Sequence, residues 1–211
     1  MSVISETLQV AGPAGSLDTL LELPAASATS VPEAFAVVCH PHPLHGGTMH
    51  NKVVHTIARA MLELGIPSFR FNYRGVGASE GAYADGVGET DDALAVIAAG
   101  SARWPDAVCI LAGFSFGGVV ALRAAARVGV QRLITVAPAV DRVPLDALQS
   151  TPRDWLLIQG LDDEVVPQVR VQSWAANLPS PPRCVWMSGV GHFFHGALNP
   201  LKTAVQAFMR A

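Results

Sequence analysis

GFSFGG at residues 113–118 joins a predicted strand at 107–113 to a predicted helix at 117–128. In this setting, the G-x-S-x-G pattern is typical of a tight turn that exposes its serine at the end of a strand. Glycines are needed on both sides because larger side chains would collide with the strained turn or the neighbouring strand. The free N–H groups at the start of the helix favour negative charge beside Ser115. The pattern predicts a nucleophilic Ser115, and a Gly/Ser turn without a chemical role is the alternative interpretation.

Strands and helices alternate along the rest of the chain. Apolar patterns predict strands at 3–10, 17–23, 35–39, 68–73, 107–113, 130–137, 155–159 and 183–187, and helices at 53–64, 89–99, 117–128, 169–177 and 197–209. Helices of this length between strands are the crossovers of a parallel sheet. We therefore predict one α/β domain over residues 1–211, with a mostly parallel central sheet and helices on both faces.

The composition favours a globular protein with a large core. Half of the 211 residues are apolar and the net charge is only −3, which excludes a disordered chain, and the scattered charges offer no basic patch for nucleic acid. The mean hydropathy of +0.35 suggests a membrane, but arginines and a glutamine interrupt the apolar stretch at 119–137. Residues 1–10 show no signal-peptide pattern. The three cysteines, Cys39, Cys109 and Cys184, are interpreted as reduced structural thiols. We expect a cytoplasmic protein.

Two further strands end in side chains that complement a serine nucleophile. A serine hydroxyl needs a neighbouring base, which a third group must orient, and ligands bind beyond the carboxyl ends of parallel strands. His192 follows the strand at 183–187 and is the predicted base, while His195 lies three residues further on. Three acids follow the strand at 155–159: Asp162, Asp163 and Glu164. The residues alone leave the choice among these acids open.

The sequence resembles the α/β-hydrolase superfamily over nearly its whole length. The resemblance rests on FAVVCHPHPLHGG at 35–47, NYRGVGAS at 72–79, GFSFGG at 113–118, DEVVP at 163–167 and GHFF at 191–194. It is most similar to the small lidless bacterial members akin to dienelactone hydrolases, although Ser115 stands where those carry cysteine, which favours ordinary ester chemistry. In the family the acid comes four residues before the proline of an Asp-x-x-Val-Pro turn. The resemblance therefore implies Asp163 as the acid and His192 as the base. His195, three residues further on at the expected helix start, is interpreted as a supporting or helix-cap residue.

The loop after the strand at 35–39 is predicted to complete an oxyanion hole. In this fold one donor is the backbone N–H after the nucleophile, that of Phe116, and the other lies in this loop. Two of its residues are prolines without an N–H, which leaves His42 or Leu44. Position relative to the strand end favours His42.

Five histidines lie between positions 40 and 55: His40, His42, His45, His50 and His55. Imidazoles are common metal ligands, but prolines stiffen the segment and no acid or cysteine lies among the histidines. We therefore predict no metal or other cofactor, and we expect His40 and His45 to brace the loop through ring hydrogen bonds. The roles of His50 and His55 are left open.

The surroundings of the site are predicted to be open and apolar. The linker at 138–151 is too short for a helical cap domain, so no cap is expected. Four apolar residues are predicted to contact the substrate: Leu44, Phe114, Val165 and Phe193. Arg74 lies beside the same crevice and is expected to tie loops together, with binding of a substrate carboxylate as the alternative.

These predictions describe a serine hydrolase that cleaves carboxylic esters of small or medium acyl groups through an acyl-enzyme. The expected partner is a small-molecule ester, with no nucleic acid and no membrane. Thioesterase, lactonase or peptidase activity on the same residues is the alternative. A non-catalytic binding module is the rival from another class, since a fold does not imply a function, but the presence of Ser115, Asp163 and His192 argues against it.

Overall fold

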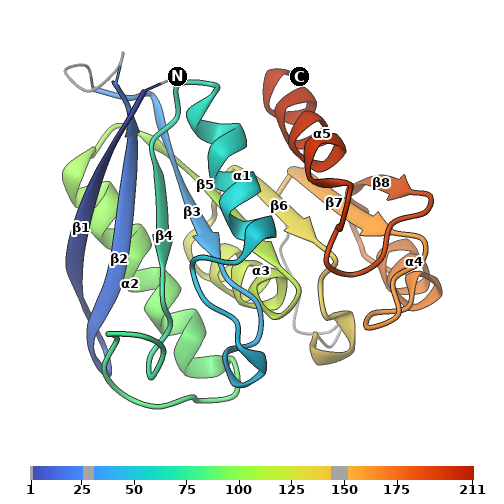
Figure 1. The fold of residues 1–211 in the computed structure, drawn as a ribbon, viewed down its shortest axis with the longest axis horizontal. Helices are drawn as coiled ribbons and strands as arrows, with labels where there is room; N and C mark the ends of the chain where they lie inside the picture. Colours follow the sequence, from blue (N-terminus) through green and yellow to red (C-terminus); the bar gives the residue numbers. More distant parts are fainter. Residues whose placement is uncertain (1, 26–30, 144–151) are drawn as a thin grey trace.

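An eight-stranded sheet forms the centre of the molecule, with the strand order β1-β2-β4-β3-β5-β6-β7-β8 (Figure 1). The computed structural model describes residues 2–25, 31–143 and 152–211. The strands are β1 (Val3–Gly12), β2 (Gly15–Pro24), β3 (Ala34–Cys39), β4 (Ser68–Phe71), β5 (Val108–Phe114), β6 (Arg132–Val136), β7 (Asp154–Gly160) and β8 (Arg183–Met187). β2 pairs antiparallel with β1 and β4, and all other neighbouring strands in the sheet are parallel. The predicted mostly parallel sheet is confirmed.

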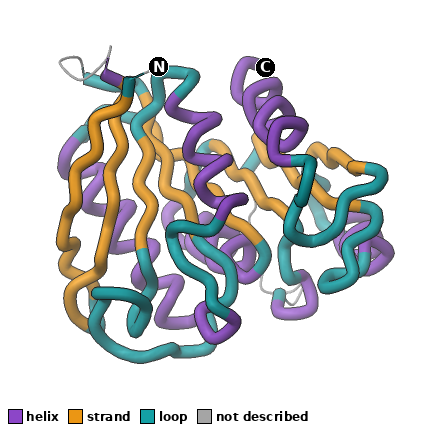
Figure 2. The backbone as a smooth tube through the Cα atoms, viewed as in Figure 1, coloured by secondary structure: helices purple, strands orange, loops and turns teal. Residues whose placement is uncertain are grey.

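Helices cover both faces of the sheet, as predicted. They are α1 (Lys52–Leu62), α2 (Val87–Arg103), α3 (Phe116–Val128), α4 (Gln168–Ala176) and α5 (Leu198–Arg210). Successive side chains of a strand point to opposite faces, so Val37 of β3 belongs to the core cluster on the face covered by α2, α3 and α4, and Val38 belongs to the cluster on the face covered by α1 and α5. The long loops, drawn in teal in Figure 2, follow the carboxyl ends of the parallel strands.

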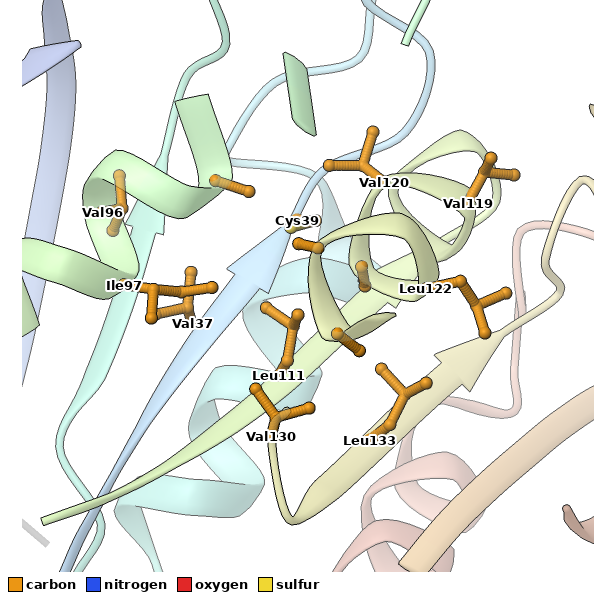
Figure 3. Packing of buried hydrophobic residues seen from close by; sticks show 14 of the residues in the cluster. Val37, Cys39, Val96, Ile97, Leu111, Val119, Val120, Leu122, Val130 and Leu133 are labelled. Atoms are coloured by element: carbon orange, nitrogen blue, oxygen red, sulfur yellow. The ribbon is translucent and has the colours of Figure 1, made fainter. Parts of the chain in front are cut away.

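The apolar patterns translate directly into packing. Figure 3 shows the cluster in which strand residues meet α2 and α3; its labelled members are Val37, Cys39, Val96, Ile97, Leu111, Val119, Val120, Leu122, Val130 and Leu133. The three cysteines are free, and burial raises the pKa of Cys39 and of Cys109 to about 12. Both thiols therefore stay protonated at neutral pH and act as apolar filling.

Most element boundaries differ from the sequence prediction by one or two residues, and for two of the differences the structure shows the reason. α2 continues to Arg103 because the next residue, Trp104, packs its ring against Phe35 and Phe69 at centroid distances of 6.0 and 5.9 Å. β4 ends at Phe71 because the following backbone leaves the ladder, and the N–H of Tyr73 donates to the His40 ring instead. The ends of α2 and β4 both depend on contacts between residues far apart in the sequence, which the local sequence pattern does not reveal.

The linker between β6 and β7 begins with a single 3-10 turn at Val140–Arg142. Its remainder at 144–151 lies outside the described residues, as does part of the loop expected at 24–32. Among the described ranges, no helix combines the length and apolarity needed to cross a bilayer.

A buried ion pair ties the loop after β4 to α2. The Arg74 guanidinium donates to both oxygens of Asp92, at 2.7 Å from Nη2 and 3.0 Å from Nε, and its backbone N–H donates to the same carboxylate at 2.9 Å. The Asp92 side chain is fully buried and that of Arg74 is 11% exposed. Arg74 therefore ties loop to helix, as expected, and its charge is already neutralised by Asp92.

Replacement of Arg74 by alanine should lower the free energy of unfolding by about 3–5 kcal/mol, because it leaves the Asp92 carboxylate buried without a partner. Urea unfolding followed by circular dichroism measures the change. Arg127→Ala is the matched control, since it removes an exposed pair with the neighbouring Asp91 and should cost less than about 1 kcal/mol. Equal losses in the two variants would contradict this account.

Candidate active site

Ser115 lies in the turn between β5 and α3 with a left-handed backbone, at φ +54° and ψ −117°. Such a φ is costly for a residue with a Cβ and persists only where the surroundings impose it. The glycines two residues away allow it. A Cβ at Gly113 would collide with the carbonyl of Gly117, and a Cβ at Gly117 would collide with that of Cys39. The steric reason predicted for this pattern holds here.

His192 lies between the other two predicted site residues. Its Nε2 is 3.1 Å from Ser115 Oγ, and its Nδ1 is 2.8 Å from Asp163 Oδ2. All three residues are buried, so little solvent competes for these bonds. The geometry fits a ring that donates from Nδ1 to the carboxylate and accepts the serine hydroxyl at Nε2. Residues from the ends of β5, β7 and β8 thus come together, although 77 positions separate Ser115 from His192.

The carboxylate of Asp163 is held by four donors. Oδ1 accepts the N–H groups of Val165 and Val166 at 2.9 and 2.7 Å, while Oδ2 accepts His192 and the Gln159 amide. Burial by itself raises the pKa of this carboxyl, but the hydrogen bonds from His192 and the two backbone groups outweigh it and hold the pKa below the ordinary 3.8. Asp163 is therefore an ionised acceptor at neutral pH.

The other two acids of the loop stay apart from the His192 ring. Asp162 and Glu164 are exposed, and Glu164 approaches only the backbone N–H of His192, with Oε2 at 3.5 Å. Of the three acids that the residues alone left open, Asp163 is the one beside the imidazole.

Gln159 is a site residue that the sequence reasoning missed. It is fully buried near the end of β7, where Nε2 donates to Asp163 Oδ2 at 2.8 Å and to the Val166 carbonyl at 3.0 Å. Its Oε1 has no hydrogen-bond partner in the described part of the chain, so the amide contributes to this site through its nitrogen alone. The signal lay in the sequence of β7, DWLLIQG, where one amide interrupts a buried apolar run.

The loop at 40–47, called the oxyanion loop below, folds back on His42. His45 and Gly47 donate their N–H groups to the His42 carbonyl at 3.1 and 3.0 Å. Leu44 donates its N–H to His42 Nδ1 at 3.3 Å, so this candidate donor is occupied. The N–H of His42 has no acceptor among the described residues, and that of Phe116 is the first in α3, where helices leave N–H groups unpaired.

Of the remaining histidines in this segment, His40 is buried and hydrogen-bonded, whereas His45, His50 and His55 are exposed. His40 accepts the Tyr73 N–H at Nε2, at 3.1 Å, and donates from Nδ1 to the Pro41 carbonyl. Burial lowers its pKa to about 3, so the ring is neutral. The His45 ring makes none of the expected hydrogen bonds to residues that the structure describes; it stacks on His42 with centroids 4.5 Å apart. Across the described ranges, no three His, Cys, Asp or Glu side chains are grouped to hold a metal ion.

Three of the four residues predicted to contact substrate are exposed on loops that carry site residues. Leu44, Val165 and Phe193 are 67%, 54% and 47% exposed. The prediction for Phe114 is wrong, because this side chain is fully buried in β5 and packs behind the His192 ring at 5.1 Å. It packs against the His192 ring and offers no surface to a substrate.

A cleft of about 300 Å³ adjoins Phe193. Its lining residues come from the oxyanion loop, the start of α1 and the segment after His192: Gly46, Thr48, His50, Asn51, Lys52, Val53, Phe193 and His195. His195 is exposed on this cleft and is not the helix cap that its position near the expected helix start suggested, because α5 begins at Leu198 with Ala197 as its N-cap.

Comparison with known proteins gives consistent matches. A family model described as serine aminopeptidase, S33, matches residues 36–188. A lidless α/β serine hydrolase from Xanthomonas campestris is 43% identical, with a TM-score of 0.91 over 98% of this chain and 94% of that one. An α/β serine hydrolase homologue from Coxiella burnetii is 41% identical, with a TM-score of 0.89 over 96% of both chains. An uncharacterized Rickettsia prowazekii protein is 29% identical over 87% of this chain and 82% of its own length. The predicted α/β-hydrolase fold without a cap domain is confirmed.

The depressed pKa of Asp163 predicts a pH-dependent contribution to stability. Because the folded chain holds this carboxyl ionised below its unfolded pKa of 3.8, its stabilisation is complete above about pH 4 and is lost as the pH falls through the folded pKa. The difference in unfolding free energy between wild type and Asp163→Asn should therefore shrink from pH 5 to pH 3, as measured by urea unfolding. Asp162→Asn, at an exposed neighbour, is the control. A difference that stays constant for Asp163→Asn, or shrinks equally for both variants, would refute the prediction.

Proposed function

The chain belongs to the α/β serine hydrolase family described as serine aminopeptidase, S33, and we propose that it hydrolyses carboxylic esters with Ser115 as nucleophile, His192 as base and Asp163 as orienting acid. The supporting observation is the continuous hydrogen-bonded path from Ser115 Oγ through both ring nitrogens of His192 to Asp163, at 3.1 and 2.8 Å. We further propose that residues 1–211 form one domain, since the sheet contains strands from both ends of the described chain.

In the acylation step, Ser115 Oγ attacks the ester carbonyl while His192 Nε2 takes the hydroxyl proton. The resulting imidazolium is stabilised by the ionised Asp163, which accepts Nδ1–H and keeps the ring in its reactive orientation. The negative charge that develops on the carbonyl oxygen is met by the backbone N–H groups of Phe116 and His42. Such donors contribute about 3–4 kcal/mol each to transition-state stabilisation. His192 then passes its proton to the leaving alcohol, and the acyl group stays on Ser115.

Deacylation repeats these steps with water. His192 takes a proton from the water, the resulting hydroxide attacks the acyl carbonyl, and the second tetrahedral intermediate collapses as the proton returns to Ser115 Oγ. The products are the carboxylic acid and the free enzyme. An approach for water is favoured because, among the described residues, the apolar side chains of Leu44, Val165 and Phe193 beside the site are exposed on loops.

Small and medium acyl groups fit the surroundings best. Leu44, Val165 and Phe193 offer an apolar rim that an acyl chain can cover in part. An open rim removes less of a long chain from water than an enclosed pocket, so the gain per added methylene falls off with length.

Peptidase activity is the second candidate, because the family model carries the description of a serine aminopeptidase. Exposed Glu164 offers a carboxylate near the base, with Oε2 3.5 Å from the His192 N–H, where a substrate ammonium group can bind. Aminoacyl p-nitroanilides and p-nitrophenyl esters, compared on one enzyme preparation, decide between the two. Turnover of the anilides without ester turnover would replace the ester proposal.

Ser115 should be the residue labelled by a fluorophosphonate, with an intact-mass increase of one adduct on the wild type and none on Ser115→Ala. The same substitution should lower kcat for p-nitrophenyl acetate by at least about 10⁴-fold. Ser188→Ala is the matched control, since it removes an exposed serine from the loop before His192. An adduct on Ser115→Ala, or none on the wild type, would overturn the assignment.

Phe193→Ala should lower kcat/KM for p-nitrophenyl hexanoate by about tenfold and change the value for the acetate by less than about twofold, because only the longer chain reaches the rim. Steady-state kinetics across the acetate-to-octanoate series give both values. Val128→Ala, at a comparably exposed residue at the end of α3, is the control and should change neither. An equal loss on both esters would place Phe193 outside the acyl site.

A further inference from the structure

We propose that Tyr83 is a positioning residue for the oxyanion loop: its hydroxyl, aligned by Asp85, holds the His42 ring and thereby fixes the backbone N–H of His42. The Tyr83 hydroxyl lies 3.2 Å from His42 Nε2 and 3.0 Å from Asp85 Oδ1. The inference rests on the proposed function, because it takes the His42 N–H as an oxyanion donor.

The hydrogen bonds assign one tautomer to the His42 ring. Leu44 donates its N–H to Nδ1, so Nδ1 carries no proton and the neutral ring carries its proton on Nε2. Nε2–H then donates to the Tyr83 oxygen, and the Tyr83 hydroxyl donates to Asp85. The direction of each hydrogen bond in this path therefore follows from the Leu44 N–H, with the Tyr83 hydroxyl accepting from His42 and donating to Asp85.

The His42 ring stays neutral in this setting. Burial lowers its pKa, and the nearby His45 and Arg142 lower it further, against smaller opposing effects of Glu89 and Asp85. A neutral ring is what the path needs, because a protonated Nδ1 would repel the Leu44 N–H and release the turn.

Aromatic contacts link the same ring to the other proposed donor. The His42 ring lies 4.8 Å from that of Phe116 and 5.2 Å from that of Tyr83, while His45 stacks on it at 4.5 Å. The two residues that offer backbone donors to the oxyanion thus touch through their side chains. A shift of the His42 ring therefore displaces one donor relative to the other.

The segment that follows Tyr83, residues 84–86, is held in place by hydrogen bonds to Glu89. The fully buried carboxylate of Glu89 accepts the N–H of Ala84 at 2.8 Å and of Gly86 at 2.7 Å. Between them Asp85 has a left-handed φ of +51°, and its carboxylate also meets Arg142 at 3.3 Å. A turn fixed at both ends gives Tyr83 a defined position from which to hold the loop.

Loss of the Tyr83 hydroxyl should therefore weaken the transition state more than substrate binding. For p-nitrophenyl acetate, Tyr83→Phe should lower kcat threefold to tenfold, the effect of about one net hydrogen bond, with KM unchanged within about twofold. Its inhibition by a boronic acid, which forms a tetrahedral adduct on serine, should weaken in parallel with kcat/KM. Asp85→Asn keeps an acceptor and should behave nearly as wild type, whereas Asp85→Ala should lower kcat. Asp91→Ala, which removes another exposed aspartate–arginine pair, is the control.

A double-mutant cycle tests whether Tyr83 acts through His42. His42→Ala keeps the backbone N–H but removes the ring, so Tyr83→Phe should have no further effect in that background. Unchanged kcat in Tyr83→Phe, a rise in KM alone, or effects that multiply in the double variant would each overturn the proposal.

The ring itself gives a readout that needs no turnover. Two-bond ¹H–¹⁵N spectra should show the wild-type His42 ring in the Nε2–H tautomer, and Tyr83→Phe should shift it toward exchange between tautomers. A wild-type ring that already exchanges, or carries its proton on Nδ1, would overturn the inference whatever the activity. A wild type with a fixed Nε2–H tautomer but no hydrolysis would instead refute the proposed function and leave the Tyr83–His42 bond intact.

Discussion

The positive φ of Ser115 is the constraint on which the arrangement at the carboxyl ends of the parallel strands depends. The backbone N–H and carbonyl of Ser115 are hydrogen-bonded to neighbouring strands and to α3. Its N–H donates to the Val136 carbonyl at the end of β6, and its carbonyl accepts the N–H of Gly118 in α3 and of Ala139 after β6. On the other side, Gly117 faces the carbonyls that end β3 so closely that no side chain fits. The ends of β3, β5 and β6 therefore meet at one serine, and the strain of its φ is balanced by bonds from two neighbouring elements.

The other two proposed catalytic residues follow the next two strands of the sheet, β7 and β8. Asp163 follows β7, which is buried along almost its whole length, and His192 follows the partly buried edge strand β8. Gln159 also holds Asp163 in place, because its amide donates to Oδ2, the same atom that accepts the imidazole N–H. Support from the other direction comes from the buried Glu89, which fixes the turn that carries Tyr83.

The sequence predicts the fold well because the apolar periodicity of this sheet is strong and the turn at Ser115 has a steric reason that residues alone reveal. It predicts Ser115 and His192 by position, but the choice of Asp163 needed the family resemblance, since three adjacent acids look alike in a sequence. Phe114 was misplaced although strand alternation contained the answer, because it shares the α1 and α5 face with Ala112 and Ile110. Gln159 and the Tyr83–His42 bond were missed because their partners come from distant segments.

The site contains buried residues and exposed residues, and substitutions in these two groups should have different consequences. The groups assigned to bond making are buried and multiply bonded, so most substitutions there carry a large cost in stability or rate. Leu44, Val165 and Phe193 stand in solvent on three loops, where replacements cost the fold little. In the proposed esterase, selection can therefore change which acyl groups are preferred through a few surface positions, without altering the residues proposed for the chemical step.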